Sequence, residues 1–334
     1  MNRTIFPRRL LPVGMAVAIL LMGASSVQAP ALVHAPLAET LGYSYSVAAN
    51  GPSAAMGFHP ADILGAGGMV LIPCANLGLI CDDPVGGGSD DLAALSYGDD
   101  FTASDLPPVH FSVAAGAQGA GGSAVRGEAG CSPAQPQADA FQSALDGANA
   151  QDLDGDGVSC GSGSGFGLAL VEGGASSDNL DALERDPCQS IDFDCNGEPD
   201  APLWFSLAAG SPSLAAAGAT AGAILVTRQD LGVTVWASAA DLGLGAGDAI
   251  NALCLRENGD GEYDSDDLVM FSLAPGSPTL TALKLTGADL LRTGPLRLAY
   301  RGNSMGLAAA DALDAATCNS SSLVKDLYLP LMSK

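Results

Sequence analysis

Apolar residues gather in two nearly identical stretches of this chain. Leu268–Leu280 reads L-V-M-F-S-L-A-P-G-S-P-T-L, and Leu203–Leu214 reads L-W-F-S-L-A-A-G-S-P-S-L. Weaker copies occupy Ser44–Gly51 and Val109–Gly116. The aromatic residues of the four copies are separated by 66, 94 and 66 residues, and they are Tyr45, Phe111, Phe205 and Phe271. Equal spacings of this kind predict an internal structural repeat of four units.

Three further sequence marks follow the F-S-L cores in the same order, and the second unit shows only the last two of them. The three marks are G-A-D-[IL]-L, L-G-L and D-x-L-D-A-L, and the last of them begins at Asp90, Asp178, Asp248 and Asp311. The second unit is 28 residues longer than its neighbours because of an insertion at about 119–164. Each unit therefore reads as three or four short strands.

The strand prediction rests on the length and flanks of the apolar runs. Leu268–Ala274 is almost continuously apolar, which is typical of a strand buried on both faces. Gly276-Ser277-Pro278 must end that strand, because proline lacks a ladder donor and glycine accepts unusual backbone angles. No long amphipathic helical pattern occurs in the sequence. The predicted fold class is all-β.

The order of the marks favours closure of the four units into a ring. The chain enters the repeat at an F-S-L strand and leaves it after a D-x-L-D-A-L strand. If these two strands pair, they complete one blade and leave no exposed sheet edge. We therefore predict one β-propeller-like domain over residues 45–316, with residues 32–44 as a lead-in and 317–334 as a C-terminal tail. A linear β array and paired β-sandwiches are the alternatives.

The first residues have the pattern of a secretory signal. A basic start, M-N-R-T-I-F-P-R-R, precedes the apolar run Leu10–Met22 and the small residues Ala29-Pro30-Ala31. This pattern predicts a signal peptide over residues 1–31 and a secreted, extracellular or cell-surface protein. A retained membrane anchor is the alternative, although the apolar run is short for a membrane span.

The net charge of the chain excludes some classes of binding partner. The formal net charge is −24, and nucleic-acid binding needs the opposite sign because Lys and Arg must replace counterions. Cations are the natural counterions of such a surface. The expected partner is an unidentified ligand, glycan or protein, with membrane contact only through an uncleaved signal or the tail.

The eight cysteines suit disulfide formation in an exported protein. Spacing makes three local pairs plausible, namely Cys74 with Cys81, Cys131 with Cys160, and Cys188 with Cys195. Cys254 and Cys318 remain. Because they occupy equivalent positions in different units, we expect them to lie too far apart to bond.

The recurring marks resemble those of secreted bacterial repeat proteins with propeller-like folds. The resemblance covers about Tyr45 to Ala316 and implies fold and export, but no activity. The first unit departs most from the pattern, with Tyr45 in place of Phe. The segment Leu327–Leu331 also resembles a short ending of exported bacterial proteins, and it is either a final strand or a sorting or docking tail.

The clearest binding motif in the sequence is that of a calcium loop. Asp152-Leu153-Asp154-Gly155-Asp156-Gly157 places carboxylates at alternate positions, with glycine where the chain turns sharply, and so gathers oxygen ligands. It resembles dockerin and thrombospondin type 3 loops. The twelfth position of an EF-hand loop would be Gly163, which offers no carboxylate. The candidate ligands of Ca²⁺ are Asp152, Asp154 and Asp156, and the alternative is a polar turn.

Two further loops share this arrangement. Their candidate ligands are Asp192, Asp194 and Asn196 in one loop, and Asn258, Asp260, Glu262 and Asp264 in the other. Turn formation is the alternative for both, since Asp and Asn bond their own backbone. The four aspartates that open the D-x-L-D-A-L segments are expected to accept backbone N–H bonds. The alternative is a cation-binding ring of these four residues in a central channel.

The sequence contains few candidate catalytic residues. Three scattered histidines, His34, His59 and His110, are not typical of a zinc site. Gly302–Gly306 matches the G-x-S-x-G elbow, but no histidine follows it. We therefore expect a secreted structural or binding repeat protein, stabilised by calcium, rather than an enzyme. An extracellular carbohydrate-active enzyme with paired carboxylates and a surface-anchored protein are the alternatives.

Overall fold

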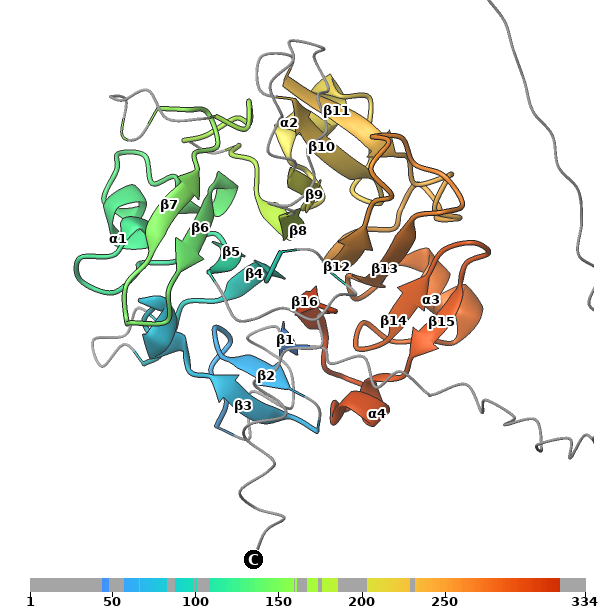
Figure 1. Ribbon diagram of the computed structural model, residues 1–334, viewed down its shortest axis with the longest axis horizontal. Helices are drawn as coiled ribbons and strands as arrows, with labels where there is room; N and C mark the ends of the chain where they lie inside the picture. The colour runs from blue at the N-terminus through green and yellow to red at the C-terminus, as the bar shows by residue number, and fades with distance from the viewer. Residues whose placement is uncertain are drawn as a thin grey trace, which may run out of the picture. The chain divides into compact units, whose positions relative to one another are not determined.

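Four antiparallel sheets of four strands each surround a common centre (Figure 1). The computed structural model describes residues 44–47, 57–65, 67–82, 88–98, 100, 108–158, 160, 167–173, 176–185, 203–228 and 232–318. These residues belong to one compact unit, 40–334. The predicted signal peptide and the tail beyond Cys318 lie outside the described residues.

Each sheet runs from an inner strand at the centre to an outer strand. The first blade consists of β16 (Leu313–Thr317), β1 (Ser44–Val47), β2 (Ile63–Gly65) and β3 (Met69–Ile72). The second consists of β4 (Leu92–Ser96), β5 (Val109–Val113), β6 (Ala140–Ser143) and β7 (Ala150–Leu153). The third consists of β8 (Leu180–Arg185), β9 (Leu203–Leu207), β10 (Ile224–Arg228) and β11 (Gly232–Ala237). The fourth consists of β12 (Ile250–Arg256), β13 (Leu268–Leu273), β14 (Leu290–Arg292) and β15 (Arg297–Tyr300).

The first blade is built from both ends of the repeat region. Strand β16 pairs with β1, and Tyr45 lies opposite Ala316. The last D-x-L-D-A-L segment thus supplies the inner strand that the first F-S-L segment lacks. The prediction of a closed propeller-like ring is confirmed. The last strand, β16, ends at Thr317, one residue after the predicted domain boundary at Ala316.

The strand register is the same in every blade. Each F-S-L aromatic residue lies opposite the last apolar residue of the D-x-L-D-A-L strand, as Phe205 does with Leu183 and Phe271 with Leu253. On its other side the aromatic residue faces the G-A-D-[IL]-L strand, where Phe271 pairs with Leu291. Apolar side chains therefore fall at equivalent depths in all four sheets, as the repeat spacing predicts.

The hydrophobic core is divided among the four contacts between neighbouring blades. One cluster joins Trp204 of the third blade to Phe271 of the fourth, and another joins Met270 of the fourth blade to Tyr45 of the first. The other two clusters join the first blade to the second and the second to the third. A core between the fourth and first blades means that the ring is closed by packing as well as by strand pairing.

Short helices and turns connect the strands. Helices α2 (Pro212–Ala216) and α3 (Pro278–Leu283) start at the proline of G-S-P, so the F-S-L strand ends where the sequence predicts. Proline fits there because the first helical residue needs no hydrogen-bonded N–H. The remaining helices are α1 (Ala124–Ala129), α4 (Gly302–Met305), η2 (Cys74–Leu77) and η3 (Pro136–Ala138). The G-x-S-x-G match is thus a helical turn of the repeat. No helix among the described residues has the length and apolar character needed to span a bilayer.

The serine of F-S-L forms a bond from one blade to the next. Ser206 Oγ donates to the Ile250 carbonyl at 3.2 Å, and Ser272 Oγ donates to the Leu313 carbonyl at 3.3 Å. Ser46 makes the same bond to Leu92. In each case the acceptor is the first residue of the next inner strand. Ser112 holds the equivalent buried position in the second blade, and its hydroxyl has no hydrogen-bond partner within the described ranges.

Replacing Ser206 or Ser272 with alanine should lower the free energy of unfolding by about 1 kcal/mol, because each change removes a buried hydrogen bond. Urea unfolding measures the loss. Ser112→Ala is the matched control, and it should be neutral or stabilising because its hydroxyl has no hydrogen bond to the described residues of the folded chain. Equal losses at all three positions would show that the inter-blade bond is not the cause.

Three disulfides are formed by described cysteines. Cys74–Cys81 and Cys131–Cys160 were predicted from spacing, and both are confirmed. The expectation for Cys254 and Cys318 was wrong, because they also form a disulfide, with Cα atoms 5.6 Å apart. The register makes Thr317, rather than Cys318, the equivalent of Cys254. The ends of the inner strands converge at the centre of a ring, whereas they would lie a full unit apart in a linear array. Cys188 and Cys195 lie outside the described residues.

Candidate functional site

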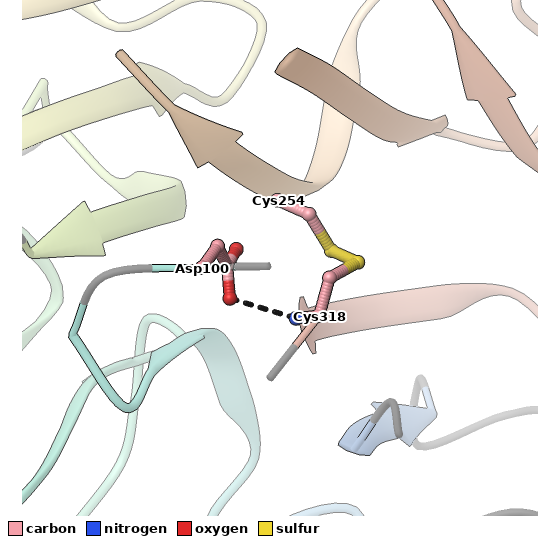
Figure 2. Close-up of side chains that lie close together, drawn as sticks. All are labelled: Asp100, Cys254 and Cys318. Atoms are coloured by element: carbon pink, nitrogen blue, oxygen red, sulfur yellow. Dashed lines mark hydrogen bonds between the residues drawn. A yellow bond between two sulfur atoms is a disulfide. The ribbon is translucent and has the colours of Figure 1, made fainter. Parts of the chain in front are cut away.

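Three groups of acidic or cysteine side chains in the described part of the chain are close enough to share a cation. Asp100, Cys254 and Cys318 form one group, shown in Figure 2. The two sulfur atoms are bonded to each other and therefore provide no thiolate. Asp100 Oδ1 accepts bonds from Thr317 Oγ1 and the Cys318 N–H, both at 2.8 Å, and Oδ2 accepts one from the Leu255 N–H at 3.1 Å. This carboxylate is already satisfied by the protein, so we interpret the group as structural.

The second group also lacks a thiolate that could bind a metal ion. It contains Glu128, Cys131 and Cys160, and the two cysteines are joined by a disulfide with Cα atoms 5.0 Å apart. Its sulfur atoms cannot act as thiolates. The disulfide does have a positional role, because it joins two points of the insertion in the second blade that are 29 residues apart in sequence.

The third group consists only of carboxylates. Asp139, Asp154 and Glu172 each place one oxygen within 4.8 Å of the others. Asp139 is 0% exposed, and Asp154 is also buried. Asp139 Oδ2 and Glu172 Oε1 are buried and have no hydrogen-bond partner among the described residues. Unpaired buried carboxylate oxygens are costly, so this cluster needs a counter-charge or a proton.

Comparison with two equivalent residues explains the unpaired oxygen of Asp139. Asp62 and Asp289 hold the same place in the G-A-D-[IL]-L mark, and each accepts one N–H from three residues earlier and one from beyond the following hairpin. Asp139 keeps the second bond, to the Gly155 N–H at 2.8 Å. The residue three before it is Pro136, which has no N–H to donate. Oδ2 therefore loses its usual donor and is free to face the cluster.

The predicted loop supplies Asp154 to the cluster. Its Oδ1 accepts the N–H groups of Gly157 and Val158, and its Oδ2 accepts a bond from Gln151 Nε2 at 3.0 Å. Each carboxylate oxygen has a further lone pair, so these bonds orient Asp154 and leave it able to act as a ligand.

Glu172 reaches the cluster because its segment lies beside the loop. The N–H groups of Leu168 and Leu170 donate to the carbonyls of Asp154 and Gly155 at 2.8 Å. A side chain at position 155 would overlap Glu172 Oε1, so glycine is required there. Gln135 Nε2 donates to Glu172 Oε2 at 2.9 Å, which leaves Oε1 directed to the other carboxylates.

The electrostatics of the cluster disfavour three negative charges. Burial away from water raises the pKa of Asp139 far above its usual range, and the neighbouring Glu172 raises it further. Burial is also the main reason that the pKa of Glu172 is raised, with added repulsion from Asp154 and Asp156. A proton bound between these groups, or a cation, would remove the repulsion.

The other two predicted ligands of the loop lie outside the cluster. Asp152 Oδ2 faces His110 Nδ1 at 3.0 Å and Arg185 Nε at 3.2 Å. Despite the cost of burial, these two partners lower the pKa of Asp152. Asp156 is exposed and accepts the Val158 N–H at 2.7 Å. Of the three residues predicted, only Asp154 belongs to the carboxylate cluster.

The second described acidic loop is organised by its own backbone. Asp260 Oδ1 accepts the Glu262 N–H, Asn258 Oδ1 accepts the Asp260 N–H, and Asp264 Oδ1 accepts the Asp266 N–H. Two more carboxylates, Glu257 and Asp267, bind further N–H groups of the same loop. These contacts are those of a turn, and calcium binding by Asn258, Asp260, Glu262 and Asp264 remains a prediction. Asp192, Asp194 and Asn196 lie outside the described residues.

The aspartates that open the D-x-L-D-A-L segments act as expected. Asp248 accepts the N–H groups of Gly245 and Thr279 at 2.7 and 2.9 Å, and Asp178 accepts those of Val171 and Ser213. Asp90 and Asp311 also accept N–H bonds from neighbouring turns. Each carboxylate ties the entry of its blade to a nearby turn, which does not favour the alternative of a cation-binding ring of these residues.

A different acidic position connects the inner strands. Asn251 Nδ2 on β12 donates to Asp314 Oδ1 on β16 at 2.9 Å. Burial, and then the charge of Asp314, raises the pKa of Asp181 on β8 to about 7. Asp181, Asn251 and Asp314 all occupy the fourth position of D-x-L-D-A-L. That position, rather than the first, brings carboxylates of different blades together.

Sequence reasoning missed Asp139 and Glu172. The signal for Asp139 was present, since a proline three residues before a G-A-D-[IL]-L aspartate removes a donor that its equivalents have. Glu172 has no comparable local signal. No protein-family model, curated protein or solved structure matches this chain.

Proposed function

We propose that this protein is an extracellular, calcium-stabilised β-propeller module that serves as a scaffold for binding. The observation that carries the proposal is the buried cluster of Asp139, Asp154 and Glu172, with two carboxylate oxygens that have no hydrogen-bond partner in the described part of the chain. The fold provides the rigid ring, and the insertion of the second blade provides the cation site together with Glu172, which follows it in sequence.

The donor chemistry favours calcium. Every candidate ligand in the cluster is a carboxylate oxygen, and Ca²⁺ prefers hard oxygen ligands in a flexible geometry. A divalent cation would neutralise the repulsion that burial intensifies. The net charge of −24 also favours cation uptake. Asp139 Oδ2 and Glu172 Oε1 would act as ligands with Asp154, while Gln135 and Gly155 orient the carboxylates.

Export is supported by independent features. Three disulfides are compatible with an oxidising compartment, in which such bonds persist. The first 31 residues have the pattern of a secretory signal. Extracellular calcium is abundant enough to occupy a site of modest affinity. A stabilising ion in a long insertion would therefore suit a protein that functions outside the cell.

Calcium should raise the thermal unfolding midpoint of the wild-type chain by about 5 °C or more, relative to chelator, when its concentration is about a hundred times Kd. The reason is mass action, since only the folded state assembles the cluster. Differential scanning calorimetry in calcium and in EDTA measures the shift. Asp139→Asn and Glu172→Gln should abolish it.

The variants also separate a metal site from a structural role. In chelator, Asp139→Asn should be at least as stable as the wild type, because the amide donates to Glu172 without the bound proton that Asp139 needs there. Asp62→Asn is the matched control, since Asp62 has the same repeat position but binds two N–H groups. It should lose stability in both conditions and keep the calcium shift. A calcium shift that survives in Asp139→Asn would contradict the proposal.

A further inference from the structure

A groove of about 570 Å³ lies between the third and fourth blades. The turn after β11 forms one wall, including Asp241 and Leu242, and the segment before β13 forms another, including Tyr263 and Asp264. The turn between β14 and β15 forms the remaining side, beginning at Arg292. The volume is within the range of small-molecule sites, roughly 300–1,000 Å³.

An aromatic ring is fixed at this groove. Tyr263 packs against Trp236 in an edge-to-face arrangement, with ring centroids 5.1 Å apart and an interplanar angle of 73°. Trp236 in turn packs against the buried Trp204 at 6.1 Å. Tyr263 remains only partly buried, so the hydrophobic core holds a ring that still contributes to the groove lining. Such a preorganised ring loses little conformational entropy on binding.

Negatively and positively charged groups both surround the aromatic ring of Tyr263. Neither the Tyr263 hydroxyl nor the Arg292 guanidinium is hydrogen-bonded within the described part of the chain. Asp241 uses Oδ2 to bind the N–H and hydroxyl of Ser238, and Asp264 uses Oδ1 to bind the Asp266 N–H. The second oxygen of each carboxylate can accept a bond from a ligand.

We propose that this groove binds a neutral oligosaccharide. The C–H face of a sugar packs against an aromatic ring, and its hydroxyl groups both donate to carboxylates and accept from a guanidinium. Asp241, Asp264 and Asp267 disfavour an anionic ligand, and the guanidinium of Arg292 favours a ligand that offers acceptor oxygens. An extended peptide is disfavoured because turns, rather than a free strand edge, make up most of the lining.

The proposal is tested with purified full-length protein and a panel of neutral oligosaccharides, with sulfated and uronic-acid oligosaccharides as the anionic arm. Saturation-transfer NMR detects binding, and titration calorimetry gives Kd. We expect binding of at least one neutral oligosaccharide. Tyr263→Ala should weaken it about tenfold or more, and Arg292→Gln should weaken it by a similar factor, since each removes a direct contact.

Arg297→Gln is the matched control, because Arg297 pairs with Arg292 on the same hairpin but does not line the groove. It should leave Kd unchanged. Asp241→Asn keeps an acceptor for Ser238 and provides a second groove variant if Tyr263→Ala folds poorly. Failure of every neutral oligosaccharide to bind at millimolar concentration would overturn the proposal, as would selective binding of anionic glycans or unchanged affinity in the groove variants. Binding that persists in chelator still supports it, because the calcium proposal concerns a different blade.

Discussion

Replacing Asp100 with alanine is expected to destabilise the protein by about 4 kcal/mol, the largest effect of any single carboxylate substitution in the centre of the ring. Asp100 follows β4 of the second blade, and its bonds reach β12 through the Leu255 N–H and β16 through Thr317. The carboxyl group of Glu184 on β8 is also close enough to lower the pKa of Asp100. One fully buried carboxyl group thus links inner strands of three blades, namely β4, β12 and β16.

The magnitude follows from the donors that would be left behind. The alanine variant would bury the Leu255 N–H, the Thr317 hydroxyl and the Cys318 N–H without their acceptor, at a cost of roughly 1–3 kcal/mol each before relaxation. Urea unfolding of the oxidised protein measures the loss. Asp100→Asn keeps one acceptor oxygen and should lose less. Asp156→Ala, at an exposed position, is the control. A loss below about 1 kcal/mol for Asp100→Ala would contradict the assigned role.

The pH dependence gives a second check on Asp100. Burial raises the pKa of Asp100 to about 6, above its ordinary value of 3.8. Between these two pKa values the folded state binds more protons than the unfolded state. The contribution of Asp100 to the free energy of unfolding therefore falls as the pH rises from about 4 to 6. The change is about 3 kcal/mol at most. Asp100→Asn does not titrate at this position, so its deficit relative to the wild type should be larger at pH 4 than at pH 7.

Removing the Cys254–Cys318 disulfide is expected to cost about 4 kcal/mol, because the two cysteines are 64 residues apart and their bond restricts a long loop in the unfolded chain. The bond also joins β12 of the fourth blade to the end of β16 in the first, where the ring closes (Figure 2). Its loss should therefore weaken closure as well as lower global stability. The Cys254→Ser, Cys318→Ser double variant, studied by urea unfolding and hydrogen exchange, measures both effects.

The Cys74–Cys81 disulfide provides the comparison. Its cysteines are only 7 residues apart, so the same loop argument gives about 2 kcal/mol for its removal. Hydrogen exchange in the Cys254→Ser, Cys318→Ser variant should increase first in β1 and β16. If β9 and β10 of the third blade lose protection equally early, the disulfide acts on the whole domain and does not secure closure.

The repeat made the fold predictable because each unit uses the same residues for the same physical purpose. An aromatic residue such as Phe271 must be buried from both sides, and Gly276-Ser277-Pro278 must end its strand. Ring closure followed from one inference, that the last D-x-L-D-A-L strand completes the first blade. The Cys254–Cys318 bond was missed because the spacing argument placed the two cysteines a full unit apart, although inner strands converge in a ring.

The candidate site was only partly predictable because its residues come from separate segments. The D-x-D-G-D pattern located the loop and Asp154. It could not show that Asp152 would be engaged by His110 and Arg185, which lie on β5 and β8. Asp139 was hidden because its role depends on a missing donor, the absent N–H of Pro136. Glu172 reaches the site through backbone pairing of Leu168 and Leu170 with the loop, which no local pattern encodes.

The most direct test of calcium binding at Asp139, Asp154 and Glu172 is a crystal structure of the protein grown with millimolar calcium. We expect an ion at this cluster, with Asp139 Oδ2 and Glu172 Oε1 at roughly 2.3–2.6 Å from it. The same crystals of Asp139→Asn should lack the ion. A wild-type structure in calcium that shows no ion at these carboxylates would contradict the account, as would an ion bound only at the loop of Asn258 and Asp260.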